Sequence, residues 1–317
     1  RAWLGNSLLV QLAAGLLFVL NLHGGQGSVL SFGGSGWSGL IIASLVGLAS
    51  LFSIGLAVQD ARRRDNEAAV QRLAWLMVFG LGFLSLAVLF VLPWQTATAV
   101  WAASGFLLMW AAQRVRLAPA FWFAVLLEGL AGLSFATTSI PQLARLAPEL
   151  TAFGHMGFWT PIIIALSAFA LAWRLHHGAQ KEVPGAFAAS GRLITLPALL
   201  WAAGWWAFGW DLELVRLTIE DGMRLAGHPF LGVMAASVLV LLLIAQRWRW
   251  AQLAGLCLTL LPLTALTALA DAERSVPLFD TFGVLGFGLA LAAQFAALRV
   301  VPGLLSASVD EMLNVVS

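Results

Sequence analysis

Residues 73–135 read LAWLMVFGLGFLSLAVLFVLPWQTATAVWAASGFLLMWAAQRVRLAPAFWFAVLLEGLAGLSF. The runs 73–92 and 95–112 contain no Asp, Glu, Lys or Arg. Each is about as long as the roughly 20 apolar residues that a helix needs to cross a bilayer. After the basic turn 113–116, a third apolar run carries one acid, Glu128. We therefore predict a transmembrane helical hairpin followed by a third span.

The composition of the whole chain indicates the same class of protein. Hydrophobic residues make up 61% of the sequence and charged residues only 10%, whereas an ordinary soluble domain carries about 25% charged residues. The single cysteine, Cys257, lies in an apolar run and has no second cysteine to pair with or to share a metal. The composition predicts an all-α, polytopic membrane protein.

Read from its start, the chain contains ten apolar runs of spanning length. The predicted spans are 3–20, 38–58, 73–92, 95–112, 119–138, 158–173, 193–210, 230–246, 250–270 and 282–298. Residues 21–39 are rich in Gly and Ser, which break helices. The polar segments 141–153 and 211–226 have apolar residues at helical spacing, which predicts short amphipathic helices on the outer face of the membrane.

These runs predict three regions. Residues 1–59 form a helical hairpin with the Gly-rich connection, residues 60–72 form a charged cytoplasmic linker, and residues 73–317 form a bundle of repeated hairpins. The chain begins with Arg1 and lacks a small-residue cleavage site after its first apolar run. We therefore expect a fragment of a longer chain, without a secretory signal peptide.

Lys and Arg are distributed unevenly over the predicted loops. Thirteen lie on the side that includes the chain start and four on the opposite side. The larger set is Arg1, Arg62, Arg63, Arg64, Arg72, Arg114, Arg116, Arg174, Lys181, Arg192, Arg247, Arg249 and Arg299, and the smaller set is Arg145, Arg216, Arg224 and Arg274. Because short cytoplasmic loops are enriched in Lys and Arg, we predict cytoplasmic ends for this segment and a multi-pass location in the bacterial inner membrane.

A weak internal repeat follows the hairpin. Gly154-His155 and Gly227-His228 each follow an amphipathic segment and precede a span that ends in arginine, and the two pairs are 73 residues apart. This pattern predicts repeated two-helix units in parallel orientation, as in transporters built from repeats. The alternative is a coincidence in a chain rich in Ala, Leu and Gly.

Several motifs resemble the DUF2339 family of predicted multi-spanning bacterial membrane proteins. They are GLGFLSLAV at 80–88, Pro93-Trp94, WAASGFLLMW at 101–110 with Arg114, LLWAAGWWAFGWDLELV at 199–215, and the stretch 277–299. The resemblance covers the chain from about Arg72 onward, and it departs from the family pattern at Ser104, where an acid is expected. It implies a long chain with many spans, and it implies no established reaction, substrate or cofactor.

Glu128 is the candidate functional residue inside the membrane. An acid in the middle of a span is costly unless it is paired, protonated or in contact with water, and such acids often serve transport. Glu128 is therefore a proton carrier or a substrate-pairing carboxylate in one interpretation. In the other, it is a protonated acid hydrogen-bonded to a neighbouring helix, which the nearby Gly129, Ala131 and Gly132 would let approach.

Further candidates lie on the predicted outer side. His23, His155 and His228 fall near span ends, where they either converge on one site or serve as separate amphipathic anchors. Asp211 and Glu213 follow the Trp-rich span 193–210, and paired carboxylates perform acid–base work or bind cations. The simpler interpretation of this pair is a solvated loop. His176-His177 is assigned to a solvated cytoplasmic linker, 174–192.

The sequence contains no zinc signature, Rossmann fingerprint, phosphate-binding loop or Ser-His-Asp spacing. The net charge of +2 arises from loop topology, so it does not indicate nucleic-acid binding. We predict no catalytic residues, metal or cofactor, and expect membrane lipids and other envelope subunits as partners. The predicted function is a non-enzymatic envelope transporter or scaffold for lipid or glycan precursors. The alternative is a membrane-embedded transferase that acts on a lipid-linked substrate at the outer face.

Overall fold

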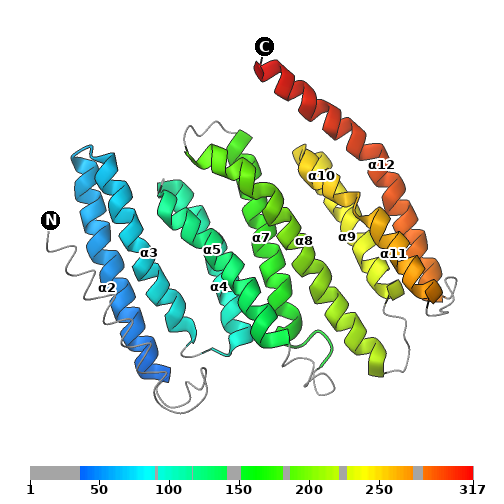
Figure 1. Ribbon diagram of the computed structural model, residues 1–317, viewed down its shortest axis with the longest axis horizontal. Helices are drawn as coiled ribbons and strands as arrows, with labels where there is room; N and C mark the ends of the chain where they lie inside the picture. Colours follow the sequence, from blue (N-terminus) through cyan, green and yellow to red (C-terminus); the bar gives the residue numbers. More distant parts are fainter. Residues whose placement is uncertain are drawn as a thin grey trace. The chain divides into compact units, whose positions relative to one another are not determined.

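The computed structural model describes residues 36–89, 92–115, 117–140, 151–180, 186–220, 227–273 and 281–316 (Figure 1). Within these ranges every regular element is a helix, which confirms the all-α prediction. Other predictions lie outside the described residues: span 3–20, the Gly-rich connection up to residue 35, and residues 141–150 of the first amphipathic helix. Residues 151–155, at the end of that predicted helix, form a turn.

The chain divides into two compact units, Arg1–Ser139 and Ile140–Ser317. The division falls after the predicted fifth span. The first unit contains α2 (Gly36–Arg63), α3 (Glu67–Leu89), α4 (Trp94–Val115), α5 (Ala118–Ser134) and the π-helical turn η1 (Phe135–Ser139). In this unit α2 packs along α3 and α4 packs along α5.

A tight turn joins α2 to α3 within the predicted charged linker 60–72. Asn66 accepts a hydrogen bond of 3.0 Å from the N–H of Ala69 on its side-chain oxygen, which caps the first turn of α3. Asp65 has a positive φ of 49°, which Asp tolerates better than most residues. Residues 60–63 belong to the end of α2, and residues 67–72 belong to the start of α3. Both helices therefore extend beyond their apolar runs into polar turns.

Two glycines set the distance between α2 and α3. A Cβ on Gly47 would lie 2.8 Å from Cγ of Leu84, and a Cβ on Gly80 would lie 2.9 Å from Cγ of Leu51. Each glycine thus accepts a leucine from the opposite helix against its backbone. Small residues permit such close helix approach in membranes, where packing replaces the hydrophobic effect.

The second unit begins with a long antiparallel hairpin. Its helices are α7 (Met156–Gln180), α8 (Ala186–Glu220), α9 (Gly227–Trp248), α10 (Ala251–Cys257), α11 (Leu260–Glu273) and α12 (Thr281–Val316). α7 packs along α8, and α9 packs against α10, α11 and α12. The most extensive packing in this unit is therefore between α7 and α8, which lie side by side in Figure 1, and between α9 and α12.

The predicted ends of the spans in this hairpin are wrong. The linker 174–192 is largely helical, because α7 continues to Gln180 and α8 begins at Ala186. The second predicted amphipathic helix, 211–226, is not a separate element at its start, because α8 runs without interruption to Glu220. No Gly or Pro follows Trp210 before the end of α8, so nothing in the sequence stops the helix there.

The predicted span 250–270 is a broken helix. α10 ends at Cys257, residues 258–259 form a turn, and α11 begins at Leu260. Pro262 has no N–H to donate to the carbonyl of Leu258, and the N–H of Leu261 donates to that carbonyl at 3.1 Å instead. The proline thus accounts for the local tightening between the two helices.

Seven helical segments in the described part of the chain are long and apolar enough to cross a membrane. They are Ser44–Arg63, Ala68–Leu89, Ala118–Ser139, Met156–His177, Gly227–Trp248, Ala251–Glu273 and Phe282–Ser306. α4 and α8 are long enough but fall outside this set; α4 begins with polar residues and α8 is rich in Trp. The membrane class is thereby supported, and the total of about ten spans stays a prediction.

Candidate functional site

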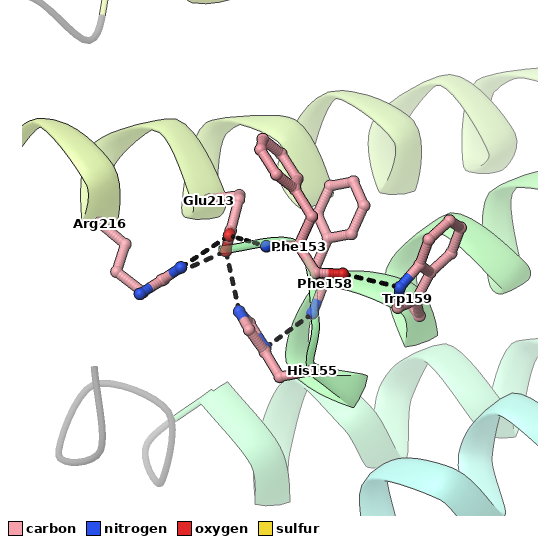
Figure 2. Close-up of polar contacts among 6 residues, drawn as sticks. All are labelled: Phe153, His155, Phe158, Trp159, Glu213 and Arg216. Atoms are coloured by element: carbon pink, nitrogen blue, oxygen red, sulfur yellow. Dashed lines mark hydrogen bonds and ion pairs between the residues drawn. The ribbon is translucent and has the colours of Figure 1, made fainter. Parts of the chain in front are cut away.

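A buried carboxylate, Glu213, joins α8 to the turn before α7. His155 Nε2 lies 2.9 Å from Oε2 of Glu213, and the backbone N–H of Phe153 donates to Oε1 at 2.7 Å. Arg216 donates through Nη2 to Oε1 at 2.7 Å and through Nε to Oε2 at 3.2 Å. Figure 2 shows Glu213 at the centre of these contacts. We call Phe153, His155, Glu213 and Arg216 the Glu213 cluster.

The hydrogen bonds of His155 assign its tautomer. Nδ1 accepts a hydrogen bond of 3.2 Å from the backbone N–H of Phe158, in the first turn of α7. The proton of a neutral ring must then reside on Nε2, which donates to Glu213. His155 therefore caps the start of α7 and anchors that start to α8 with the same ring.

The carboxylate of the Glu213 cluster is buried, so the negative charge of Glu213 needs a positive partner inside the cluster. Glu213 is 1% exposed and Arg216 is 9% exposed. A buried carboxylate is stable only when it is paired and hydrogen-bonded, and the fork of an Arg side chain provides both through two parallel bonds. Arg216 lies three residues after Glu213, so one turn of α8 carries both charges of the pair.

Phe153 adopts a backbone conformation that is unusual for a bulky residue. Its φ is 56°, in the left-handed region that favours glycine. Its N–H donates to Glu213, its carbonyl accepts a bond of 2.9 Å from Nε1 of Trp159, and its ring contacts Phe158 and Trp210. These contacts on both sides hold Phe153 in its strained conformation, and such strain often marks functional sites.

The two carboxylates of the predicted pair have opposite pKa shifts. Burial acts to raise the pKa of Glu213, but the hydrogen bonds from Arg216, Phe153 and His155 outweigh it and lower the pKa. Asp211 is exposed on α8, and the apolar side chains that partly shield it raise the pKa of its carboxyl. The solvated-loop interpretation of this pair is therefore wrong for Glu213.

A second histidine–carboxylate pair lies in the same unit. His228 Nε2 is 2.9 Å from Oδ2 of Asp271, and both residues are buried. α12 closes against this pair: a Cβ on Gly286 would lie 2.6 Å from the carbonyl oxygen of His228, and the ring of Phe287 meets the imidazole edge to face. Only glycine permits this approach of α12 to the backbone of α9.

The two histidine–carboxylate pairs occupy corresponding places in successive helix pairs. His155 precedes α7 and binds an acid near the end of α8, while His228 begins α9 and binds Asp271 near the end of α11. The Gly-His sequence repeat thus has a counterpart in side-chain contacts. The carboxylate of Glu213 additionally binds Arg216, within one helical turn, and the backbone N–H of Phe153.

Of the two interpretations of the outer-face histidines, convergence on one site is not what the described residues show. His155 pairs with Glu213 and His228 pairs with Asp271, so the two histidines have separate partners. Asp211 is not a partner in either pair, and His23 lies outside the described residues. Sequence reasoning missed Arg216 and Asp271. Matching the charged ends of consecutive antiparallel spans would have found Asp271.

Glu128 lies at the interface between α4 and α5. It is 5% exposed, and a Cβ on Gly105 of α4 would be 3.6 Å from its Oε2 and 3.1 Å from the carbonyl oxygen of Ala124. Glu128 therefore faces a neighbouring helix, as an acid paired within the protein should. The small residue at this contact is Gly105, whereas a Cβ on Gly129 would meet nothing within 4 Å.

An apolar groove of about 370 Å³ lies nearby, between α3 and α5. Its lining includes Trp75, Val78, Trp122 and Leu126, and Glu128 is not part of it. Among the described residues, no group of three or more His, Cys, Asp or Glu side chains is arranged to hold a metal ion.

Comparisons with protein-family models, with curated proteins and with solved structures find no match to this chain. The resemblance to the DUF2339 family therefore stays a prediction from the quoted motifs.

Proposed function

We propose that this chain is a non-enzymatic, multi-pass protein of the bacterial inner membrane. In this proposal it is a scaffold that holds lipid or glycan precursors or partner subunits, with both ends of the segment on the cytoplasmic side. The thirteen-to-four distribution of Lys and Arg supports the orientation. The resemblance to DUF2339 agrees with a multi-spanning membrane protein and adds no reaction.

One observation carries the choice of a scaffold over a transferase. Each oxygen of Glu213 accepts two hydrogen bonds: Oε1 from Phe153 and Arg216, and Oε2 from His155 and Arg216. An ionised carboxylate has about four acceptor positions, and all of them are used here. A general base needs an accessible lone pair to take a proton from its substrate. The geometry of Glu213 therefore favours a structural role.

The proposal is tested by incubating proteoliposomes of the full chain with a polyprenyl-phosphate-linked sugar. The scaffold proposal expects the lipid-linked sugar to be recovered bound and chemically unchanged. Formation of a transferred product would favour the transferase, provided that Glu213→Gln abolishes it at matched amounts of folded protein. Asp211→Asn tests the other candidate acid, which is exposed and lies two residues away on the same helix.

Transport is the second candidate, and Glu128 is the observation that favours it. A carboxylate buried within a span is expensive to keep and is often retained because it carries a proton or pairs with a substrate. If the chain is a transporter, the transported species moves along the interface of α4 and α5. The contact between Glu128 and Gly105 then closes this path. Uptake or efflux by the proteoliposomes would then be lost in Glu128→Gln while the protein remains folded.

A further inference from the structure

A cluster of aromatic rings forms where α7 ends beside the turn from α9 to α10. His176 stacks on Trp250 with ring centroids 4.8 Å apart, and Trp173 lies 5.3 Å from Trp248. His177 contacts Trp173 and Trp248 at 4.9 and 5.6 Å. The prediction that His176 and His177 belong to a solvated linker is therefore wrong, because both lie on α7 within this cluster.

Three arginines accompany the aromatic cluster. Arg247 and Arg249 alternate with tryptophans in the sequence Arg-Trp-Arg-Trp at 247–250, and Arg174 directly follows Trp173. Arg247 and Arg249 are exposed, and Arg174 is partly exposed. The described segments that meet here, 170–180 and 240–257, contain no Asp or Glu. This end of the second unit thus carries three arginines next to a packed aromatic cluster, in which Trp250 is buried and Trp173 and Trp248 are partly exposed.

The backbone at Arg249 is an independent sign that its side chain is used. Its φ is 50°, and the N–H of the next residue, Trp250, donates to the carbonyl of Ala245 at 2.9 Å. This is the helix-ending motif whose left-handed position is normally glycine. An arginine there strains the backbone, and strain at a single residue points to a function for that residue. The turn holds Arg249 between Trp248 and Trp250.

From these contacts we infer that Arg174, Arg247 and Arg249 bind the phosphate group of an anionic phospholipid. Arginine matches a phosphate through two parallel hydrogen bonds, and tryptophan favours the depth of the lipid headgroups. The site lies on the side that the charge distribution predicts to be cytoplasmic, where anionic lipids attract basic residues next to a span. The inference does not depend on the proposed scaffold function, because transporters and scaffolds alike would use such a lipid.

The test measures lipid retained by the purified full chain in native mass spectrometry, after exchange into phosphatidylglycerol or phosphatidylcholine. The triple variant Arg174→Gln, Arg247→Gln, Arg249→Gln should lower retention of phosphatidylglycerol by at least about tenfold. Retention of phosphatidylcholine, in which choline offsets the charge of the phosphate, should fall less. The matched control is Arg62→Gln, Arg63→Gln, Arg64→Gln, which removes three arginines on the same predicted side of the membrane, from the first unit. If both triple variants lose phosphatidylglycerol equally, the loss depends only on the overall charge of the protein, and the proposed site is contradicted.

A second variant distinguishes a loss of lipid binding from a loss of folding. Arg249→Gly places glycine at the left-handed position, so it should raise the melting temperature and at the same time lower retention of phosphatidylglycerol. Full retention in this variant and in the triple variant would contradict the inference. Inorganic phosphate is the competitor that separates the two sources of a phosphate group. Displacement of the lipid by millimolar phosphate would assign a site for free anions and overturn the assignment to phospholipid.

Discussion

The backbone N–H of Phe153 donates a hydrogen bond of 2.7 Å to Oε1 of Glu213, 60 residues further along the chain. This contact ties the turn before α7 to the last part of α8. It uses a backbone donor, so no side-chain substitution at position 153 removes the donor except proline. This link between the turn and α8 therefore depends on the acceptor, Glu213.

Glu213→Gln should strongly destabilise the second unit. The substitution leaves Arg216 buried without its counter-charge, and breaking a buried ion pair in this way costs about 3–5 kcal/mol. The free energy of unfolding in mixed detergent micelles is the measurement. The control Asp211→Asn, at an exposed position, should change that free energy by less than about 0.5 kcal/mol. Similar losses in both variants would contradict the cluster.

The shifted pKa of Glu213 predicts how stability depends on pH. Because the folded state lowers the pKa from the ordinary value of 4.5, Glu213 stabilises the fold above pH 4.5 and loses this effect as the pH falls further. The contribution of Asp211 to stability changes with pH in the opposite direction, because the folded state raises the pKa of its carboxyl. The difference in unfolding free energy between the parent and Glu213→Gln should therefore shrink on acidification. Both proteins should carry Asp211→Asn, so that the titration of Asp211 does not contribute. If the difference in unfolding free energy does not depend on pH, the lowered pKa of Glu213 is refuted.

Gly286→Ala should destabilise the packing of α12 on α9. The new Cβ would lie 2.6 Å from the carbonyl oxygen of His228, and a backbone atom cannot move aside as a side chain can. Overpacking of this kind costs about 1–3 kcal/mol. Gly288→Ala is the matched control, since a Cβ there meets nothing within 4 Å and should stabilise α12 by about 0.5–1 kcal/mol. Thermal unfolding of both variants distinguishes the two effects, which must have opposite signs.

The orientation of the chain is tested at the turn between α2 and α3. In a Cys257→Ala background, a single cysteine at Asn66 should react with an impermeant thiol reagent only after the inner membrane is opened. The residue is exposed, so access is set by the membrane alone. Labelling of intact cells from the periplasm would reverse the predicted topology.

Glu128→Gln separates the transport and scaffold candidates. The amide keeps the shape and most hydrogen bonds of the side chain but cannot ionise, so a carried proton or a paired cation is lost. Gly105→Ala provides a structural comparison, because its Cβ would lie 3.1 Å from the carbonyl oxygen of Ala124 and push the helices apart. If Glu128→Gln supports growth of a deletion strain as fully as the parent, the transport candidate fails.

The class of the fold is readable from the sequence because apolar runs of spanning length are a direct consequence of the bilayer. The run 119–138, for example, corresponds to the apolar segment Ala118–Ser139. The ends of helices were less predictable. Charged residues at 174–180 and 211–220 suggested loops, yet both segments continue their helices, because charge marks the edge of the membrane and not the end of a helix.

The partners of the site residues could not be predicted for a different reason. Glu213 and His155 are 58 residues apart, and no local spacing rule connects them. Proximity in sequence suggested a pair of Asp211 and Glu213, but on a helix residues two apart point in different directions. The i,i+3 relation of Glu213 to Arg216 was the local signal that could have been used.

The contact between Phe153 and Glu213 also orders events during biosynthesis. The ribosome releases Phe153 well before Glu213, so the turn before α7 has no acceptor for this hydrogen bond until the end of α8 has been made. A shorter delay separates His228 from Asp271, 43 residues later. Each pair is therefore completed only when the returning helix arrives, which makes the helix pair, and not the single helix, the smallest piece that the insertion machinery can release in its final form.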